Sequence, residues 1–279
     1  MLVLAAALAL SIGVVLGMLG GGGAILTLPM LVYAVGLEPK AAIASSLFVV
    51  GATSVVGMTV HARAGAVRWK VGGMFGVAAM AGAYGGGQLS HLIPGRMLLV
   101  LFGIVMVVTA TAMLKGRKAS AGAPPELRLG RALGLGAAVG ILSGLVGAGG
   151  GFLIVPALTL FGGLAMREAI GTSLFVIALQ SFAGFAGHIT HVHLEWTLVL
   201  VITATSLVGS VGGAMLGAKL SPHGLRRAFA WLVIAMGLFM FAKQLPPVIA
   251  AIAAALTLIA VFIVTRTSTP SPPSPAAST

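Results

Sequence analysis

The chain has 279 residues, of which 59% are hydrophobic and 7% are charged; 16 Lys and Arg against four acids give a net charge of +12. Soluble domains carry about 25% charged residues, so this composition excludes an ordinary soluble domain and predicts an integral membrane protein. The long uninterrupted apolar runs favour helices over a membrane β-barrel. The basic residues lie in short loops between these runs, which indicates membrane orientation rather than nucleic-acid binding.

The apolar segments follow one another in two similar series. The first covers residues 2–35, 41–61, 70–90 and 96–114, and the second covers 132–163, 168–187, 196–217 and 224–242. A last segment, 246–265, precedes a tail rich in Ser, Thr, Pro and Ala. We therefore expect a first transmembrane repeat at 1–118, a second at 119–243, an extra transmembrane helix at 244–266 and a disordered tail at 267–279. A signal peptide is not expected, because the start Met1-Leu2-Val3-Leu4 has neither a basic n-region nor a clear cleavage site.

The two series are copies of each other at a constant spacing of 127 residues (156 − 29). Chance similarity between apolar runs would align Leu and Val, but rarely polar and aromatic residues. Here such residues do align, as in the pairs Pro29 and Pro156, Ser46 and Ser173, His61 and His188, and Trp69 and Trp196. The spacing indicates an internal duplication.

Each series opens with a glycine cluster inside its long apolar segment. The first cluster is Gly20, Gly21, Gly22 and Gly23, and the second is Gly147, Gly149, Gly150 and Gly151. Glycine weakens a helix and frees backbone N–H groups. In hydrocarbon, such a break is tolerated only where it lines a cavity, and one break per repeat is typical of a transporter's substrate site.

Loop charge distinguishes two topologies. If each broken segment crosses the membrane completely, the 16 basic residues divide nine to seven, which is no bias. If each is a re-entrant hairpin, thirteen lie on one side and only Lys40, Arg96 and Lys243 lie opposite, as the positive-inside rule predicts. We therefore expect an all-α integral membrane protein with an inverted repeat. Each half would be a glycine-broken re-entrant helical hairpin plus three transmembrane helices, followed by the extra C-terminal helix.

The glycine clusters predict a site for a small anion, because helix N-termini after them would offer free N–H groups and a partial positive charge. The alternative is close helix packing through small residues. Hydroxyls that could complete the site are those of Ser45, Ser46, Thr172 and Ser173, unless they bond back to their own helix. Gln180 and its counterpart Thr53 are further polar candidates at membrane depth.

His61 and His188 are candidates for proton coupling, since His titrates near neutral pH; an ordinary interfacial location is the simpler alternative. No metal site is predicted, because neither carboxylates nor thiolates complete a ligand set around the histidines. No cofactor is expected. Trp69 and Trp196 are expected at the membrane interface.

These motifs resemble the sulfite exporter TauE/SafE family. The resemblance rests on the glycine-rich motifs that end in Pro29 and Pro156, on Gly171-Thr172-Ser173-Leu174-Phe175 with its twin Ala44-Ser45-Ser46-Leu47-Phe48, and on Gly65-Ala66-Val67-Arg68-Trp69 after His61. It covers about 10–243. Arg68 and Glu195 stand where the family pattern Gly-x-Val-Asp-Trp has Asp. The resemblance implies movement of sulfite or organosulfonates across the bacterial inner membrane, often as export.

The sequence thus predicts a secondary transporter that exports a small sulfur-containing anion by alternating access, with the N-terminus outside and the C-terminus cytoplasmic. A passive anion channel and a non-transporting membrane scaffold are the alternatives. An enzyme is not expected, because the catalytic motifs HExxH, Ser-His-Asp and paired Asp do not occur. The expected partners are the anion and membrane lipids, with no nucleic acid; a homo-oligomer is left open.

Overall fold

A computed structural model describes residues 2–19, 24–115, 129–147, 149–160, 163–217 and 222–267 of the chain. The predicted glycine site at Gly20–Gly23 and the predicted tail after Thr267 lie outside these residues. The described elements are α1 (Leu2–Leu19), α2 (Ala24–Pro29), the π-helix η1 (Met30–Ala34), α3 (Pro39–Arg63), α4 (Trp69–Ser90), α5 (Gly95–Lys115), α6 (Leu129–Val146), α7 (Gly151–Leu160), α8 (Met166–His188), α9 (Trp196–Gly217), α10 (Pro222–Gln244) and α11 (Pro247–Thr267).

The prediction of an all-α membrane protein is confirmed for this part of the chain. Four of the helices are long and apolar enough to cross a membrane, and they are Pro39–Arg63, Gly95–Ala112, Arg167–His191 and Trp196–Gly213. Shorter apolar helices lie in α1, α6, α10 and α11. Helices α9 and α11 carry exposed apolar side chains, as expected of surfaces that face lipid.

Five helices of the second half begin 127 residues after five helices of the first half. The starts that pair in this way are those of α1 and α6, α2 and α7, α3 and α8, α4 and α9, and α5 and α10. The halves differ after the hairpin turn, where Pro29 is followed by a π-helical turn. Proline has no N–H to donate, but the aligned Pro156 lies inside α7, which continues as an α-helix to Leu160, so proline alone does not explain the difference.

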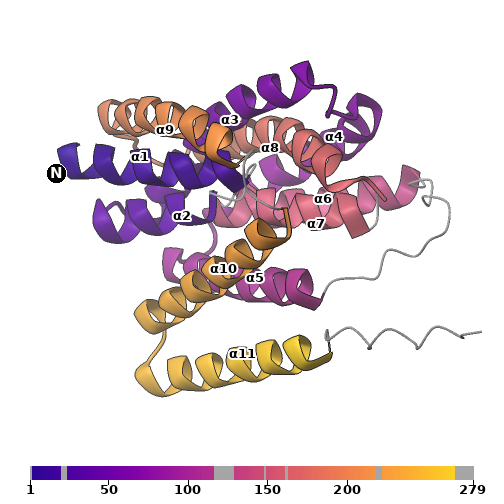
Figure 1. Ribbon diagram of the computed structural model, residues 1–279. Coiled ribbons are helices and arrows are strands. Elements are labelled where there is room, and N and C mark those ends of the chain that lie inside the picture. Colours follow the sequence, from indigo (N-terminus) through magenta and orange to yellow (C-terminus); the bar gives the residue numbers. More distant parts are fainter. Residues whose placement is uncertain are drawn as a thin grey trace, which may run out of the picture.

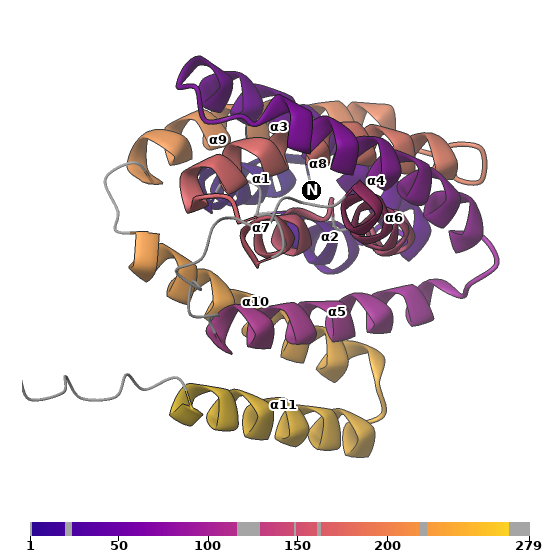
Figure 2. The same ribbon diagram turned by 90° about the vertical axis from the view of Figure 1, so that its right-hand side faces the viewer.

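The hairpin helices occupy the centre of the molecule. Viewed nearly end-on, α1, α2, α6 and α7 lie between a layer that contains α3, α8 and α9 and a layer formed by α5 and α10 (Figure 2). Helix α11 lies outside the second layer, beside α10 and α5 (Figure 1).

The first helix of each half packs along the fourth helix of the other half. Helix α1 packs on α9 and α6 packs on α4, so the two hairpin arms are exchanged between the halves. Glycines allow this approach: a Cβ on Gly140 would overlap the carbonyl oxygen of Ala79, and one on Gly144 would overlap that of Ala83. The residue numbers of the contacting positions increase in the same direction along both helices, so α6 and α4 run parallel. These glycines serve close packing, as small residues do between membrane helices.

Helices that correspond by the repeat run antiparallel where they meet. On α3 and α8 the numbers of contacting residues change in opposite directions, from Leu47 beside Gly184 through Gly51 beside Phe182 to Gly57 beside Leu174. On α5 and α10, Arg96 Nε donates to the carbonyl oxygen of Gln244, and Val107 lies against Gly237. Each pair therefore joins a helix to an oppositely directed copy of itself.

The two tryptophans, which are expected at the membrane interface, are exposed. Trp69 is 54% exposed and packs edge-on against Phe175, with ring centroids 5.1 Å apart. Its counterpart Trp196 is 45% exposed and packs edge-on against Phe48 at 5.8 Å. Each tryptophan thus contacts a phenylalanine of the other half.

Candidate functional site

The turn of the second hairpin is built on glycines in left-handed conformations. Gly147, Gly149 and Gly150 have φ values of 70°, 60° and 69°, which residues other than glycine rarely adopt. The Gly147 N–H donates to the carbonyl oxygen of Ser143 and ends α6. The carbonyl oxygen of Gly150 accepts from the N–H groups of Leu153 and Ile154 and starts α7.

This turn leaves backbone donors free. Among the described residues, the N–H groups of Gly149 and Gly150 donate to no other group. They stand at the N-terminus of α7, where the helix dipole favours negative charge. Main-chain amides without side chains around them are the donors that small oxyanions bind at helix N-termini.

Gln180 of α8 holds the glycine turn. Its Nε2 donates to the carbonyl oxygen of Gly149 at 2.8 Å and to Ser143 Oγ at 3.2 Å. The side chain is fully buried, and a Cβ on Gly150 would overlap its Nε2. Residue 150 must therefore be glycine, because any side chain there would block Gln180 from the turn. The other polar candidate, Thr53, donates instead to the carbonyl oxygen of Val49 on its own helix, at 2.8 Å.

The four hydroxyls predicted for the site have different partners, although all four residues are buried. Ser45 donates to the carbonyl oxygen of Ala41, and Ser173 donates to that of Ile170. Thr172 Oγ1 accepts the backbone N–H of Arg68 at 2.9 Å. Only Ser46, among these four, has a buried hydroxyl with no partner.

Thr172 and Ser173 do not lie at the level of the glycine turn. They precede Gln180 by eight and seven residues on α8, which corresponds to about 12 and 10 Å at 1.5 Å per residue. Thr172 lies instead against Gly72 at the start of α4. The structure therefore places Gly147, Gly149 and Gly150 together with Gln180, and it places Thr172 beside the loop between α3 and α4.

The two repeat-related histidines have different surroundings. His188 is buried; its Nε2 lies 2.7 Å from the carbonyl oxygen of Gly144, and its Nδ1 lies 3.0 Å from Ser90 Oγ. A carbonyl oxygen only accepts, so Nε2 carries a proton. His61 is half-buried, and its side chain packs near Gly171. Among the described residues, only His188 of these two histidines forms a side-chain hydrogen bond with α6.

Several polar residues of this region escaped the sequence analysis. Ser143 and Ser90 have Leu16 and Gly217 as their repeat counterparts, so the duplication gave no signal for them. Ser54 and Ser181 are buried hydroxyls without a partner. They do align at the repeat spacing, which is a signal that could have found them.

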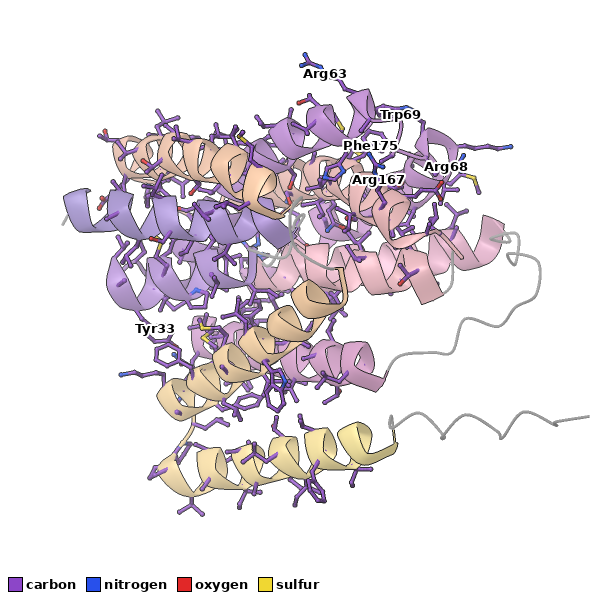
Figure 3. All side chains as sticks on the ribbon, viewed as in Figure 1. Tyr33, Arg63, Arg68, Trp69, Arg167 and Phe175 are labelled. Atoms are coloured by element: carbon purple, nitrogen blue, oxygen red, sulfur yellow. The ribbon has the colours of Figure 1, made fainter. Side chains whose placement is uncertain are left out.

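An ion pair joins the halves at one end of the molecule. Arg68 donates to Glu168 Oε1 through Nε at 3.0 Å and through Nη2 at 2.5 Å. This hydrogen-bonded pairing raises the pKa of the Arg68 guanidinium above its ordinary value. Figure 3 shows Arg68, Arg63 and Arg167 toward the same end, and Tyr33 toward the other. In the described part of the chain, His and Glu side chains form no cluster that could hold a metal ion.

Comparison with known proteins shows the family of the chain. Residues 5–240 match the family described as "Sulfite exporter TauE/SafE". The chain belongs to the sulfite exporter TauE/SafE family. A probable membrane transporter protein of Xylella fastidiosa (strain 9a5c) is 34% identical over 236 residues, which cover 82% of this chain and 90% of the relative.

The chain is also similar to proteins from distant organisms. The probable membrane transporter protein YdhB of Bacillus subtilis is 29% identical over 75% of this chain and 85% of its own length. A probable membrane transporter protein of Methanocaldococcus jannaschii is 29% identical over 82% of this chain and 92% of its own. The family match over residues 5–240 confirms the resemblance seen in the motifs. No solved structure matches significantly.

Proposed function

We propose that the protein is a secondary transporter that exports sulfite or an organosulfonate across the bacterial inner membrane by alternating access. The observation that carries this proposal is the second hairpin turn, where the free N–H groups of Gly149 and Gly150 lie beside the buried amide of Gln180. Membership of a family described as sulfite exporters supports a sulfur oxyanion as the cargo.

The antiparallel pairing of corresponding helices supports an inverted repeat. If both halves crossed in the same direction, α3 and α8 would run parallel, and so would α5 and α10. Contacts of Gly51 with Phe182 and of Arg96 with Gln244 fit the opposite arrangement. Three crossings after each re-entrant hairpin would invert the second half. In this proposal the repeats are 1–118 and 119–243, 244–266 is an extra transmembrane helix, and 267–279 is a tail.

Contacts of the basic residues support the proposed orientation. Two of the three basic residues expected outside lie at one end, where Lys40 Nζ donates to the carbonyl oxygen of His91 and Arg96 donates to that of Gln244. Lys243, the third, is the neighbour of Gln244 in the chain. Arg63, Arg68 and Arg167 lie toward the other end (Figure 3), which would be cytoplasmic. The N-terminus would then be outside and the C-terminus cytoplasmic.

The substrate site of this proposal combines both hairpin turns. Its proposed members are Gly20, Gly21, Gly22 and Gly23 of the first turn, Gly147, Gly149, Gly150 and Gly151 of the second, and Ser46, whose buried hydroxyl has no partner among the described residues. The other three hydroxyl residues of the sequence prediction, Ser45, Thr172 and Ser173, are bonded elsewhere and are left out of the proposed site. Because each hairpin arm packs on the other half, a rocking movement of the halves would shift one turn relative to the other. His188, and less directly His61, would couple proton movement to the anion.

Transport by the purified protein in liposomes tests the proposal. We expect labelled sulfite to enter protein-containing liposomes and to enter faster when unlabelled sulfite is present inside, because a carrier exchanges substrate across the membrane. Sulfite flux without this acceleration would favour a passive channel. If neither sulfite nor any organosulfonate crosses faster than in protein-free liposomes, the proposed function is wrong and a scaffold role gains support.

A further inference from the structure

The carboxamide of Gln180 has one atom with a partner and one without. Nε2 donates to Gly149 and Ser143, whereas Oε1 is buried and accepts no hydrogen bond among the described residues. Buried polar atoms nearly always have a partner, because an unpaired one loses its hydrogen bonds to water without replacement. This acceptor therefore requires an explanation.

Neighbouring groups fix which way the carboxamide faces. The carbonyl oxygen of Gly149 has no hydrogen to donate, so the amide nitrogen and not the amide oxygen of Gln180 must lie against it. A flipped amide would place two acceptors 2.8 Å apart. The unpaired atom is accordingly Oε1, an acceptor.

The position of Nε2 shows that Oε1 is close to the glycine turn. Within a carboxamide the oxygen and the nitrogen are about 2.3 Å apart, as their bond lengths to the shared carbon require. Nε2 of Gln180 would overlap a Cβ on Gly150, and Cδ lies 3.3 Å from the position of that Cβ, so Oε1 lies within a few ångströms of the turn that carries the N–H groups of Gly149 and Gly150. The site thus presents donors together with one acceptor.

We infer that Gln180 selects an anion that carries its own hydrogen-bond donor, either a protonated oxyanion or a sulfonate with a hydroxyl or amino group. The anion's oxygens would accept from the backbone N–H groups, and its O–H or N–H would donate to Gln180 Oε1. This inference rests on the proposed function. Under it sulfite would bind as hydrogen sulfite, which is abundant near neutral pH, and a sulfonate without a donor would bind weakly.

Competition against labelled sulfite uptake, with the full-length protein in liposomes, tests the inference. The probes are isethionate, which ends in a hydroxyl, and propanesulfonate, which has a methyl group in place of that hydroxyl. A lost hydrogen bond that leaves a buried acceptor unpaired corresponds to about a tenfold change in affinity. We expect isethionate to inhibit at about tenfold lower concentration than propanesulfonate.

Two substitutions assign the preference to Gln180. Gln180→Met keeps an unbranched side chain but has no amide oxygen, and it should reduce the preference to near unity. Thr53→Val changes the repeat-related position, whose hydroxyl bonds to its own helix, and it should keep the preference. Gln180→Asn, which withdraws the oxygen by one methylene, replaces Gln180→Met if the latter does not fold, and it too should lower the preference.

The outcomes separate the two proposals. Equal inhibition by the two probes in the unmodified protein would overturn the inference while sulfite uptake upholds the proposed function. A preference that survives in the Gln180 variant would also overturn the inference, since the selection would then come from elsewhere. Absence of sulfite and sulfonate uptake in the unmodified protein would overturn the proposed function, and the inference with it.

Discussion

The imidazole of His188 joins α8 to the last turn of the hairpin helix α6 through a 2.7 Å contact between Nε2 and the carbonyl oxygen of Gly144. On its other side, Nδ1 lies 3.0 Å from Ser90 Oγ on α4. Three helices from both halves therefore meet at one buried side chain. Gly144 is only three residues before Gly147, so this contact also positions the glycine turn.

His188→Ala should lower the thermal stability of the detergent-solubilised protein by several degrees. The substitution removes both contacts and takes the side-chain donor away from the buried carbonyl oxygen of Gly144, which costs about 1–3 kcal/mol, whereas Ser90 Oγ keeps its hydrogen bond to the carbonyl oxygen of Gly87. Fluorescence-detected thermal unfolding measures the change. His61→Ala, at the half-buried repeat counterpart, is the control and should change the melting temperature little. Equal destabilisation by the two substitutions would show that the His188 contacts do not stabilise the hairpin.

Neighbouring glycines of α4 should respond differently to alanine. A Cβ on Gly86 would overlap the carbonyl oxygen of Ile141 on α6, so Gly86→Ala must push the helices apart and should cost about 1–3 kcal/mol. Gly85 has nothing within 4 Å of its Cβ position, and Gly85→Ala should be neutral or stabilise the helix by up to about 1 kcal/mol. Melting temperatures of the two variants check this. Similar values would mean that α4 and α6 pack less closely than the structure shows.

Adjacent serines on α3 should separate binding from helix structure. Ser46 has a buried hydroxyl without a partner, whereas the hydroxyl of Ser45 donates to Ala41. If Ser46 contributes a hydrogen bond to the anion, Ser46→Ala should raise the sulfite concentration for half-maximal uptake about tenfold. Ser45→Ala should leave it unchanged. Uptake by Ser46→Ala that matches the unmodified protein would remove Ser46 from the site.

Breaking the ion pair between Arg68 and Glu168 should open the proposed cytoplasmic side. The chain has no cysteine, so a single Ala66→Cys reports on access to the buried loop beside this pair. Arg68→Glu should speed its labelling by a membrane-impermeant maleimide added from the cytoplasmic side. The exchanged pair, Arg68→Glu with Glu168→Arg, should restore slow labelling. Labelling that is unaffected by either change would show that the ion pair does not hold the halves together.

Much of the architecture could be predicted from the sequence, because aligned residues such as Pro29 and Pro156 fix the repeat spacing. The helix starts follow that spacing through α5 and α10. The scarcity of Lys and Arg in the long apolar runs indicates a membrane protein. The charge of the loops also predicts that Arg68 and Arg96 lie on opposite sides, which agrees with their positions at opposite ends of the molecule.

The partners of individual polar side chains could not be predicted. Helices α3 and α8 are apolar on all sides, so periodicity does not tell which way Ser45, Ser46 or Thr172 points. Helix rotation and tertiary contacts decide the direction of each side chain, and they place Thr172 Oγ1 against the backbone N–H of Arg68. Gln180 was recognised as a polar candidate, but its role at the glycine turn depends on the depth at which α6 ends, which sequence spacing does not reveal.

The most direct test of the central claim, that backbone amides of a glycine turn bind the anion, is sulfite binding to purified Gly150→Ala by isothermal titration calorimetry. An alanine there would be strained at φ 69° and would displace Gln180, so we predict at least tenfold weaker binding than in the unmodified protein. Gly85→Ala should bind like the unmodified protein. Folded Gly150→Ala that binds sulfite as tightly as the unmodified protein would contradict the account.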